Sequence, residues 1–364
     1  LQGVTAHLVR CEKKMALGRP VRVVDGSSCS MPDTPENQAA YPQPPRQKAG
    51  CGFPVMRVVG LFSLATGALL GAAHGALSVH ERILWHQLWD LLNPGDIALA
   101  DRGFCAYADY VLLKRRGVDC VMRLHQRRKS GVKKRKRLAK NDWLVEWVKT
   151  AVRPKWLTPE QWSELPQTLL VRHVTVHVAI KGFRTKKFMV ATTLLDAKAY
   201  PAQVLADLYR KRWMVELYLR DIKVTMGMDV LRCKTPALLQ KEFTMHLIAY
   251  NLVRAFMLKA ATLHRLECSN LSLAGALATV RHWAPAIAAR PRSQHPQAIA
   301  THPQCIADAL VSTGIGTGGL NASIGRARAN TDNGSRFGAH ILGDFQECAA
   351  GDLLADVVVA GADE

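Results

Sequence analysis

Four residues with chemically useful side chains recur at helical spacing between positions 209 and 223. They are Tyr209, Arg212, Glu216 and Lys223, separated by three, four and seven residues. At 100° per residue, these intervals place the four side chains within an arc of roughly 60° on one helix face. Such a face is either a solvated row of salt bridges or a polar seam that binds a metal ion and a phosphate. The seam is favoured by the apolar residues around it: Trp213, Val215, Leu217, Leu219 and Ile222.

Two aspartates are predicted to close short apolar strands. Asp25 ends the strand predicted over residues 21–25 and precedes a Gly-Ser-Ser turn, and Asp101 follows the strand predicted over residues 96–100. Adjacent strands and a crossing helix can bring these two acids to Glu216. Three such carboxylates repel one another unless a cation binds among them, and oxygen ligands select Mg²⁺ or Mn²⁺. Two ions about 3.5–4 Å apart could activate a water or a 3′-hydroxyl in phosphodiester chemistry.

The elements needed to position these acids can be read from hydrophobic periodicity and turn residues. Residues 32–54 are rich in proline and polar residues and predict a surface loop. The order of the remaining elements indicates an α/β fold of mixed strand directions, not a doubly wound dinucleotide fold, because it opens with a hairpin. These elements are a hairpin over 56–77 that turns at Ala65-Thr66-Gly67, a helix over 81–92, a strand over 96–100, a helix over 107–116 and a strand over 119–124.

Residues 126–196 predict an insertion that is mostly β. It opens with a basic run, in which eight of the eleven residues from 127 to 137 are Lys or Arg. We expect a solvated loop here, either a solubilising tract or a DNA-binding element. The candidate DNA contacts in the run are Arg127, Arg128, Lys133, Lys134, Arg135, Lys136 and Arg137.

Four tryptophans follow within twenty residues, and alternating strands are predicted over 168–179 and 188–195 around a Lys181-Gly182 turn. The tryptophans either form the core of the insertion or offer a stacking surface for an unpaired base. They are Trp143, Trp147, Trp156 and Trp162.

Helical sequence resumes at Pro201, and further helices are predicted over 242–264 and 271–283. Residues 293–364 carry three basic and eight acidic residues, a net charge of −5, against 46 basic and 21 acidic residues, or +25, before them. We therefore expect a disordered acidic tail. Only 24 residues precede Asp25, so we also expect a shortened N-terminal region. The predicted division of the chain is a remnant over 1–20, a core over 21–125, the insertion over 126–196, completion of the core over 197–290 and the tail over 291–364.

The composition favours a polyanionic partner. With 49 Lys and Arg against 29 Asp and Glu, the formal net charge is +20 and the isoelectric point about 9.8. This indicates nucleic acid or an anionic membrane surface. The apolar run over 58–73 is shorter than the roughly 20 residues of a spanning helix, so we expect buried strands and no membrane association. The nine cysteines form no C-x-x-C pair, which predicts reduced thiols in the cytoplasm and no zinc site.

Together these motifs resemble the bacterial DDE-type insertion-sequence transposases, in the branch named for insertion sequence four. That branch carries a Y-x₂-R-x₃-E-x₆-K signature, present here as Tyr209, Arg212, Glu216 and Lys223. Its first acid is commonly followed by Gly and Ser or Thr, as Asp25 is here. Its second acid opens an Asp-Arg-Gly-Phe motif, as Asp101 does here. The resemblance covers roughly residues 20–285.

The resemblance implies an RNase H-like catalytic core interrupted by a β-rich insertion before the glutamate. It implies that Asp25, Asp101 and Glu216 are catalytic and hold two Mg²⁺ ions, which Mn²⁺ can replace, while Tyr209, Arg212 and Lys223 bind DNA phosphates. The partners implied are double-stranded DNA, both transposon ends and target, and further copies of the chain in a synaptic complex. In some members, but not all, the freed 3′-hydroxyl attacks the opposite strand to form a hairpin. The resemblance therefore does not decide whether this chain forms one.

Two other functions remain compatible with the sequence. One is a DNA-binding remnant that uses the basic body electrostatically but does not assemble on element ends. The other is an RNase H-like nuclease that cleaves DNA without strand transfer. The presence of all three acids favours catalysis over the remnant.

Overall fold

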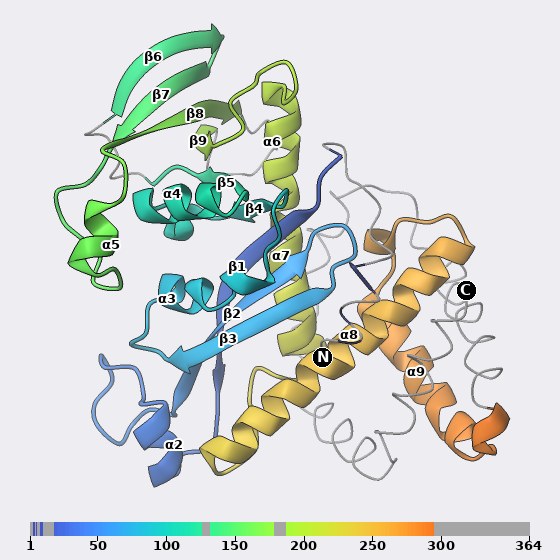
Figure 1. Ribbon diagram of the computed structural model, residues 1–364. Helices are drawn as coiled ribbons and strands as arrows, with labels where there is room; N and C mark the ends of the chain where they lie inside the picture. Colours follow the sequence, from blue (N-terminus) through green and yellow to red (C-terminus); the bar gives the residue numbers. More distant parts are fainter. Residues whose placement is uncertain are drawn as a thin grey trace.

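A computed structural model describes residues 18–125, 132–177 and 187–294, together with Gly3, Thr5, Leu8 and Val9. The described residues form one nine-stranded sheet in the order β3-β2-β1-β4-β5-β9-β8-β7-β6 (Figure 1). The strands predicted over 126–196 therefore extend the same sheet as the predicted core. Residues 295–364, which hold almost all of the predicted tail, lie outside the described residues.

The first five strands form the half of the sheet that carries the two aspartates. β1 runs antiparallel to β2 and parallel to β4, and β4 runs parallel to β5. This order, with β1 central and β2 and β3 as a hairpin, is the RNase H-like arrangement that the resemblance implies. The bounds are β1 (Val21–Ser30), β2 (Val55–Ser63), β3 (Leu69–Ala76), β4 (Ile97–Ala100) and β5 (Asp119–Arg123).

The hairpin between β2 and β3 confirms the prediction that residues 58–73 form buried strands. Its turn needs glycine at Gly67, where φ is +69° and an added Cβ would lie 1.7 Å from the Arg254 guanidinium. In the part of the chain that the structure describes, no helix has the length and apolar character needed to span a bilayer.

Helices cover both faces of the sheet and create two apolar cores. On one face, α3 and α4 pack on alternate residues of the central strands such as Val24, Ala98 and Ala100. On the opposite face, α6, α7 and α8 pack on Val21, Val23 and Leu99. The bounds are α3 (Glu81–His86), η1 (Trp89–Leu91), α4 (Tyr107–Arg115), α6 (Ala202–Lys211), α7 (Trp213–Arg220), α8 (Pro236–Leu263) and α9 (Leu273–Ala288).

The predicted surface loop over 32–54 is wrong in part, because residues 35–40 form the short helix α2 (Pro35–Ala40). The Thr34 hydroxyl accepts a hydrogen bond from the Asn37 N–H, and Pro35 occupies the first helical position, so the sequence carries both a cap and a start signal. Asn37 is fully buried, and its amide donates to the carbonyls of Pro32 and Cys233. These bonds tie α2 to the segment before α8.

The second half of the sheet contains β6 (Val132–Ala139), β7 (Asp142–Val148), β8 (Thr168–His177) and β9 (Lys187–Thr192), with α5 (Pro159–Ser163) between β7 and β8. The mostly β content predicted for the insertion is therefore observed. Its tryptophans pack inward: Trp147 is fully buried and its N–H lies 2.8 Å from His173 Nε2, while Trp143, Trp156 and Trp162 pack against the α3 and α4 core. Trp147 is therefore a core residue, whereas the other three tryptophans are partly buried and pack against the core.

Candidate active site

Asp25 and Asp101 lie side by side on neighbouring parallel strands. The last paired positions of β1 and β4 are Val23 and Leu99, and each aspartate comes two residues later. Because side chains alternate along a strand, both acids point to the face occupied by Val23 and Leu99, which α6 and α7 cover. The predicted convergence of two strand acids is therefore present in the geometry.

The prediction that Asp25 ends its strand is wrong. β1 continues to Ser30, and residues 26–30 pair with β2 from Val59 back to Val55. Only the β4 side of β1 loses its partner, because β4 stops at Ala100. Asp25 therefore lies within a long strand but beside an open edge, which leaves its carboxylate accessible while β2 holds its backbone.

The helix segment with the signature residues crosses this edge. Tyr209 lies near the end of α6, Glu216 lies in α7, and Arg212 is the residue between the two helices. The Arg212 guanidinium contacts two acids, with Nη1 3.3 Å from Asp25 Oδ2 and Nη2 2.7 Å from Glu216 Oε1. The Tyr209 hydroxyl donates to Asp101 Oδ1 across 3.3 Å. Each of the three predicted catalytic acids is thus joined to a residue of the signature.

The site also carries unbalanced negative charge. The pKa of Asp25 is raised to about 6, mainly by burial and to a smaller extent by the neighbouring charges of Glu216 and Asp101. The Gly26 N–H, 2.9 Å from Asp25 Oδ1, and the Arg212 guanidinium lower this pKa, but they do not cancel the increase. Burial also raises the pKa of Tyr209, which keeps its phenol protonated and able to donate to Asp101. The three carboxylates are therefore close enough to repel one another.

Lys223 departs from the predicted single helical stripe. The helix does not continue with regular winding past Arg220 but forms a π-helical turn, η3 (Asp221–Thr225), in which the Met226 N–H donates to the Asp221 carbonyl. The wider turn rotates Lys223 away from the direction that regular 3.6-residue winding predicts. The ammonium of Lys223 acts electrostatically on Cys29, further along β1 than Asp25. Tyr209 and Arg212 therefore contact the three acids, of which Glu216 is one. Lys223 lies beside the end of β1.

The donor chemistry of this site fits a hard divalent cation. Asp25, Asp101 and Glu216 offer only carboxylate oxygens, and the charges of Glu216 and Asp101 both act on Asp25. Within the described ranges, however, no three His, Cys, Asp or Glu side chains are already arranged as a metal site. A guanidinium, which is itself a cation, lies between two of the three acids.

From Val132 onward, the predicted basic loop is instead an edge strand. β6 pairs with β7, for example Val132 with Trp147 and Arg137 with Trp143. A strand pairing on one side only can expose charged side chains, which is how edges commonly resist aggregation. Lys136 and Arg137 are exposed, and the Arg137 guanidinium lies 5.7 Å from the centroid of the Trp143 ring. Among the other predicted contacts, Arg127 and Arg128 lie outside the described residues. Lys133, Lys134 and Arg135 belong to the β6 backbone.

Sequence reasoning missed two residues beside Tyr209. Arg123 ends β5, the strand next to β4, and its guanidinium lies 5.5 Å from the centroid of the Phe188 ring. Phe188, in β9, packs on Tyr209 with ring centroids 5.1 Å apart. The positive charge of Arg123 also reaches the Tyr209 hydroxyl, whose pKa it lowers against the larger effect of burial. A basic residue at the end of the strand beside Asp101 was the available signal.

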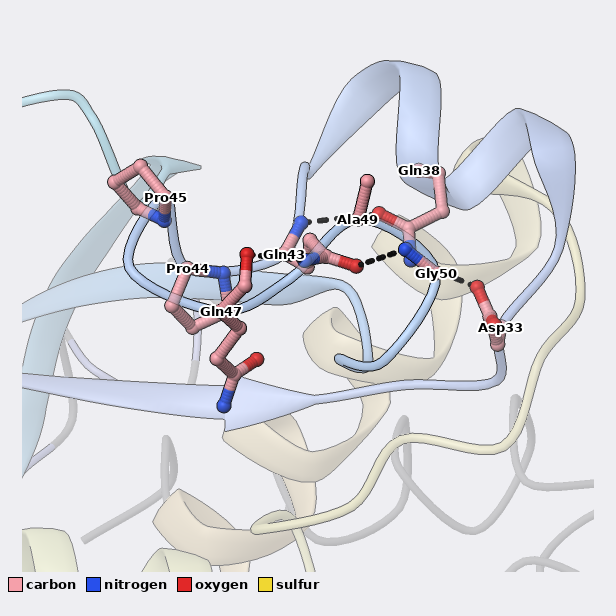
Figure 2. Close-up of a pocket in the computed structure, with 8 residues that line it drawn as sticks. All are labelled: Asp33, Gln38, Gln43, Pro44, Pro45, Gln47, Ala49 and Gly50. Carbon is pink, nitrogen blue, oxygen red and sulfur yellow. Dashed lines mark hydrogen bonds between the residues drawn. The ribbon is translucent and has the colours of Figure 1, made fainter.

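Two hollows in the surface lie apart from these acids. One, of about 390 Å³, lies between α2 and the loop that follows it, where Gln43 Oε1 accepts from the Gly50 N–H and Gln38 donates to Asp33 (Figure 2). The other, of about 410 Å³, is lined by residues that include His86, Trp89 and Trp156. The polar side chains in the first hollow bind the loop itself, so the acids remain the better candidate for chemistry.

Comparison with known proteins adds two kinds of similarity. Residues 16–252 match the family described as "Transposase DDE domain". The chain is also 30% identical to "Transposase InsG for insertion sequence element IS4" of Escherichia coli (strain K12) over 246 residues, which are 67% of this chain and 53% of that protein. It thus spans about half of that relative's length.

Among solved structures, the chain is similar to a piggyBac transposase synaptic complex with hairpin DNA, determined by cryo-electron microscopy. The TM-score is 0.41 and the sequence identity 6%, over 89% of this chain and 59% of the other.

Proposed function

Since the chain belongs to the transposase DDE domain family, we propose that it cleaves phosphodiester bonds at the ends of a mobile DNA element and transfers the freed 3′-hydroxyl to target DNA. The observation that carries this proposal is the meeting of Asp25, Asp101 and Glu216 beside Arg212 and Tyr209 at the open edge of β1. The net charge of +20 supports DNA as the partner.

In this proposal Asp25, Asp101 and Glu216 hold two Mg²⁺ ions, and Mn²⁺ can replace them. The bound ions would activate the attacking oxygen and stabilise the leaving oxygen of the phosphodiester. The oxygen-only donor set supports Mg²⁺ over softer metals. The three carboxylates would position the reaction at the carboxyl end of β4 and the neighbouring open edge of β1, where DNA can approach from the open side.

Cationic residues around the acids would orient the DNA backbone. Arg212 can form two parallel hydrogen bonds to a phosphate, Lys223 adds a point charge, and Tyr209 donates one hydroxyl. We add Arg123 to this set because it lies against Phe188 beside Tyr209. The exposed basic side chains of β6 would contact DNA further from the reacting bond.

The proposed partners are double-stranded DNA at transposon ends and at the target, and a second copy of the chain in a synaptic complex. Assembly of this kind is a proposal for the whole protein, since the chain covers 53% of its relative. A DNA substrate of a bacterial element places the proposed reaction in the cytoplasm, at the nucleoid.

The decisive experiment removes one metal-binding oxygen at a time. Asp25→Asn, Asp101→Asn and Glu216→Gln should each reduce Mg²⁺- or Mn²⁺-dependent nicking of a duplex carrying the element's end by about a thousandfold or more, because several kcal/mol of charge stabilisation are lost. Ca²⁺ should not support nicking, since it accepts looser geometry. DNA binding should be unchanged or tighter, because each substitution removes a negative charge.

Asp207→Asn is the matched control, because Asp207 is an exposed acid on α6 that pairs with Arg210. It should retain full activity. Near wild-type nicking by any of the three acid variants would refute the site. Nicking without joining of a pre-cut 3′-end to target DNA would instead support a nuclease without strand transfer.

A further inference from the structure

The guanidinium of Arg212 occupies the place between two carboxylates where a metal ion would bring them together. Its two terminal nitrogens contact different acids, Asp25 at 3.3 Å and Glu216 at 2.7 Å. The guanidinium also lies 5.9 Å from the centroid of the Tyr209 ring, whose hydroxyl contacts Asp101. One cation therefore lies among all three predicted metal ligands.

This cation does not saturate its partners. One positive charge faces two carboxylates directly, and a third, Asp101, acts on Asp25 through space. The side chains remain partly open to solvent, with 14% of Arg212, 22% of Asp25 and 35% of Glu216 exposed. A divalent ion would neutralise the acids more completely than a single guanidinium, and the site is open enough for the exchange.

Local winding of the backbone separates Arg212 from the rest of the helix. The Arg212 N–H donates to the Tyr209 carbonyl at 3.1 Å, and the Val215 N–H donates to the Arg212 carbonyl at 3.0 Å. Both bonds span three residues, which is 3₁₀ winding, and such a turn within a helix often marks a functional hinge. The α7 helix is held independently by buried Val215 and Leu219. The Arg212 side chain can therefore change partner while Glu216 stays in place.

We propose that Arg212 acts as a placeholder cation, which bridges Asp25 and Glu216 in the metal-free protein and moves to a DNA phosphate when a divalent ion binds. This inference rests on the proposed function, and it assigns Arg212 a second role besides phosphate contact. Since metal binding frees the guanidinium for DNA, the two ligands are coupled. By linkage, each must then raise the affinity for the other by the same factor.

The first test measures metal binding without DNA. Mn²⁺ binding, followed by electron paramagnetic resonance, should be about tenfold tighter in Arg212→Gln than in the wild type, because the competing guanidinium is gone. Lys211→Gln is the matched control: Lys211 is exposed and adjacent, and it has the same charge, so its loss should leave the metal affinity unchanged. Arg212→Gln should also melt at a lower temperature in EDTA and gain more from Mn²⁺ than the wild type does.

The second test measures coupling on a short random-sequence duplex at constant ionic strength. Mn²⁺ should increase the DNA affinity of the wild type by about tenfold and that of Arg212→Gln by little. Arg212→Lys should lie between them, because a single ammonium cannot bridge both acids in the same way. This variant retains the charge and guards against misfolding of Arg212→Gln.

Two failures can be told apart. If Asp25→Asn binds Mn²⁺ as the wild type does, the acids are not the metal site and the proposed function fails with the inference. If Asp25→Asn loses Mn²⁺ while Arg212→Gln binds it no more tightly than the wild type, Arg212 is a phosphate contact only. The placeholder role is then refuted and the proposed function stands.

Discussion

Among the arginines that bind carboxylates, Arg172 and Arg212 have opposite surroundings. Arg172, in β8, is fully buried and forms two hydrogen bonds with Asp142, at 2.8 and 2.6 Å. Its third nitrogen donates to the Tyr200 carbonyl at 2.7 Å, just before α6. Arg212 is partly exposed and shares its guanidinium between two acids.

The difference separates a structural ion pair from an exchangeable one. Arg172 and Asp142 satisfy each other with matched charge and no access for a competitor, so the pair fixes the β7 and β8 strands to the start of α6. Arg212 faces excess negative charge at an open edge, so another cation can replace it. Burial and charge balance, not the residue types, decide which arginine is free to take part in function.

The largest expected effect tests the structural pair. Arg172→Ala should reduce the free energy of unfolding by about 3–5 kcal/mol, because Asp142 would remain buried without a partner. Urea denaturation followed by tryptophan fluorescence would measure this, since Trp147 lies in the adjacent strand. Arg212→Ala should reduce stability by about 1 kcal/mol or less, as expected for a partly exposed pair.

Asp142→Asn combined with Arg172→Met removes both charges and is the control for the single substitution. The double variant should recover part of the stability that Arg172→Ala loses, because no charge is left unpaired. Equal losses for Arg172→Ala and Arg212→Ala would remove the distinction between the two arginines.

A third arginine gives an intermediate case. Arg254, in α8, is buried, stacks at 4.9 Å from the Tyr218 ring centroid and donates through Nη2 to the Thr66 carbonyl at 2.8 Å. Asp221, at the start of the π-helical turn, lies within its electrostatic reach. Burial nevertheless raises the pKa of Asp221 to about 6, against the opposing effects of Arg254, Arg220 and the Thr225 hydroxyl. The charge of Asp221 is therefore only partly compensated.

This case predicts a pH-dependent stability. Because the pKa of Asp221 is higher in the folded chain than in the unfolded chain, where it is about 3.9, its contribution is complete below about pH 4 and is lost as the pH rises through 6. Asp221→Asn should therefore raise the free energy of unfolding by about 1–2 kcal/mol at pH 8 and by less at pH 5. Chemical denaturation at both pH values measures this; an equal effect at both would mean that Asp221 ionises normally.

The sequence was enough to predict the two strand aspartates and the helix that carries Glu216. It did not predict which side chains contact one another. A short apolar run located β4 and therefore Asp101, and three- and four-residue spacing placed Tyr209, Arg212 and Glu216 on one face. The end of β1 was wrong because Gly26, Ser27 and Ser28 read as a turn locally, while pairing with β2 overrides that preference. The π-helical turn at Lys223 could not be predicted, since it depends on how α7 packs rather than on local residue preference.

The basic run over residues 127–137 also shows that local sequence preference does not predict strand pairing. Residues Lys133–Arg137 contain no apolar side chain, so periodicity gave no strand signal, yet the backbone pairs with β7. An edge strand needs only hydrogen bonds from one neighbour, and its side chains can all face solvent if the neighbour supplies the apolar contacts. Trp147 and Val145 of β7 do so.

The smallest expected effect concerns this edge. Lys136→Ala and Arg137→Ala should each lower the slope of log affinity against log salt for double-stranded DNA by about 0.9, one phosphate contact apiece, because both side chains are exposed on β6. Stability should change by less than about 0.5 kcal/mol, since neither residue is buried. Lys155→Ala, at a basic position of the α5 connection, is the charge-matched control and should leave the slope unchanged. A loss of stability without a change in slope would mean that Arg137 packs on Trp143 and does not contact DNA. The basic residues of β6 would then have a structural role, as Arg172 does.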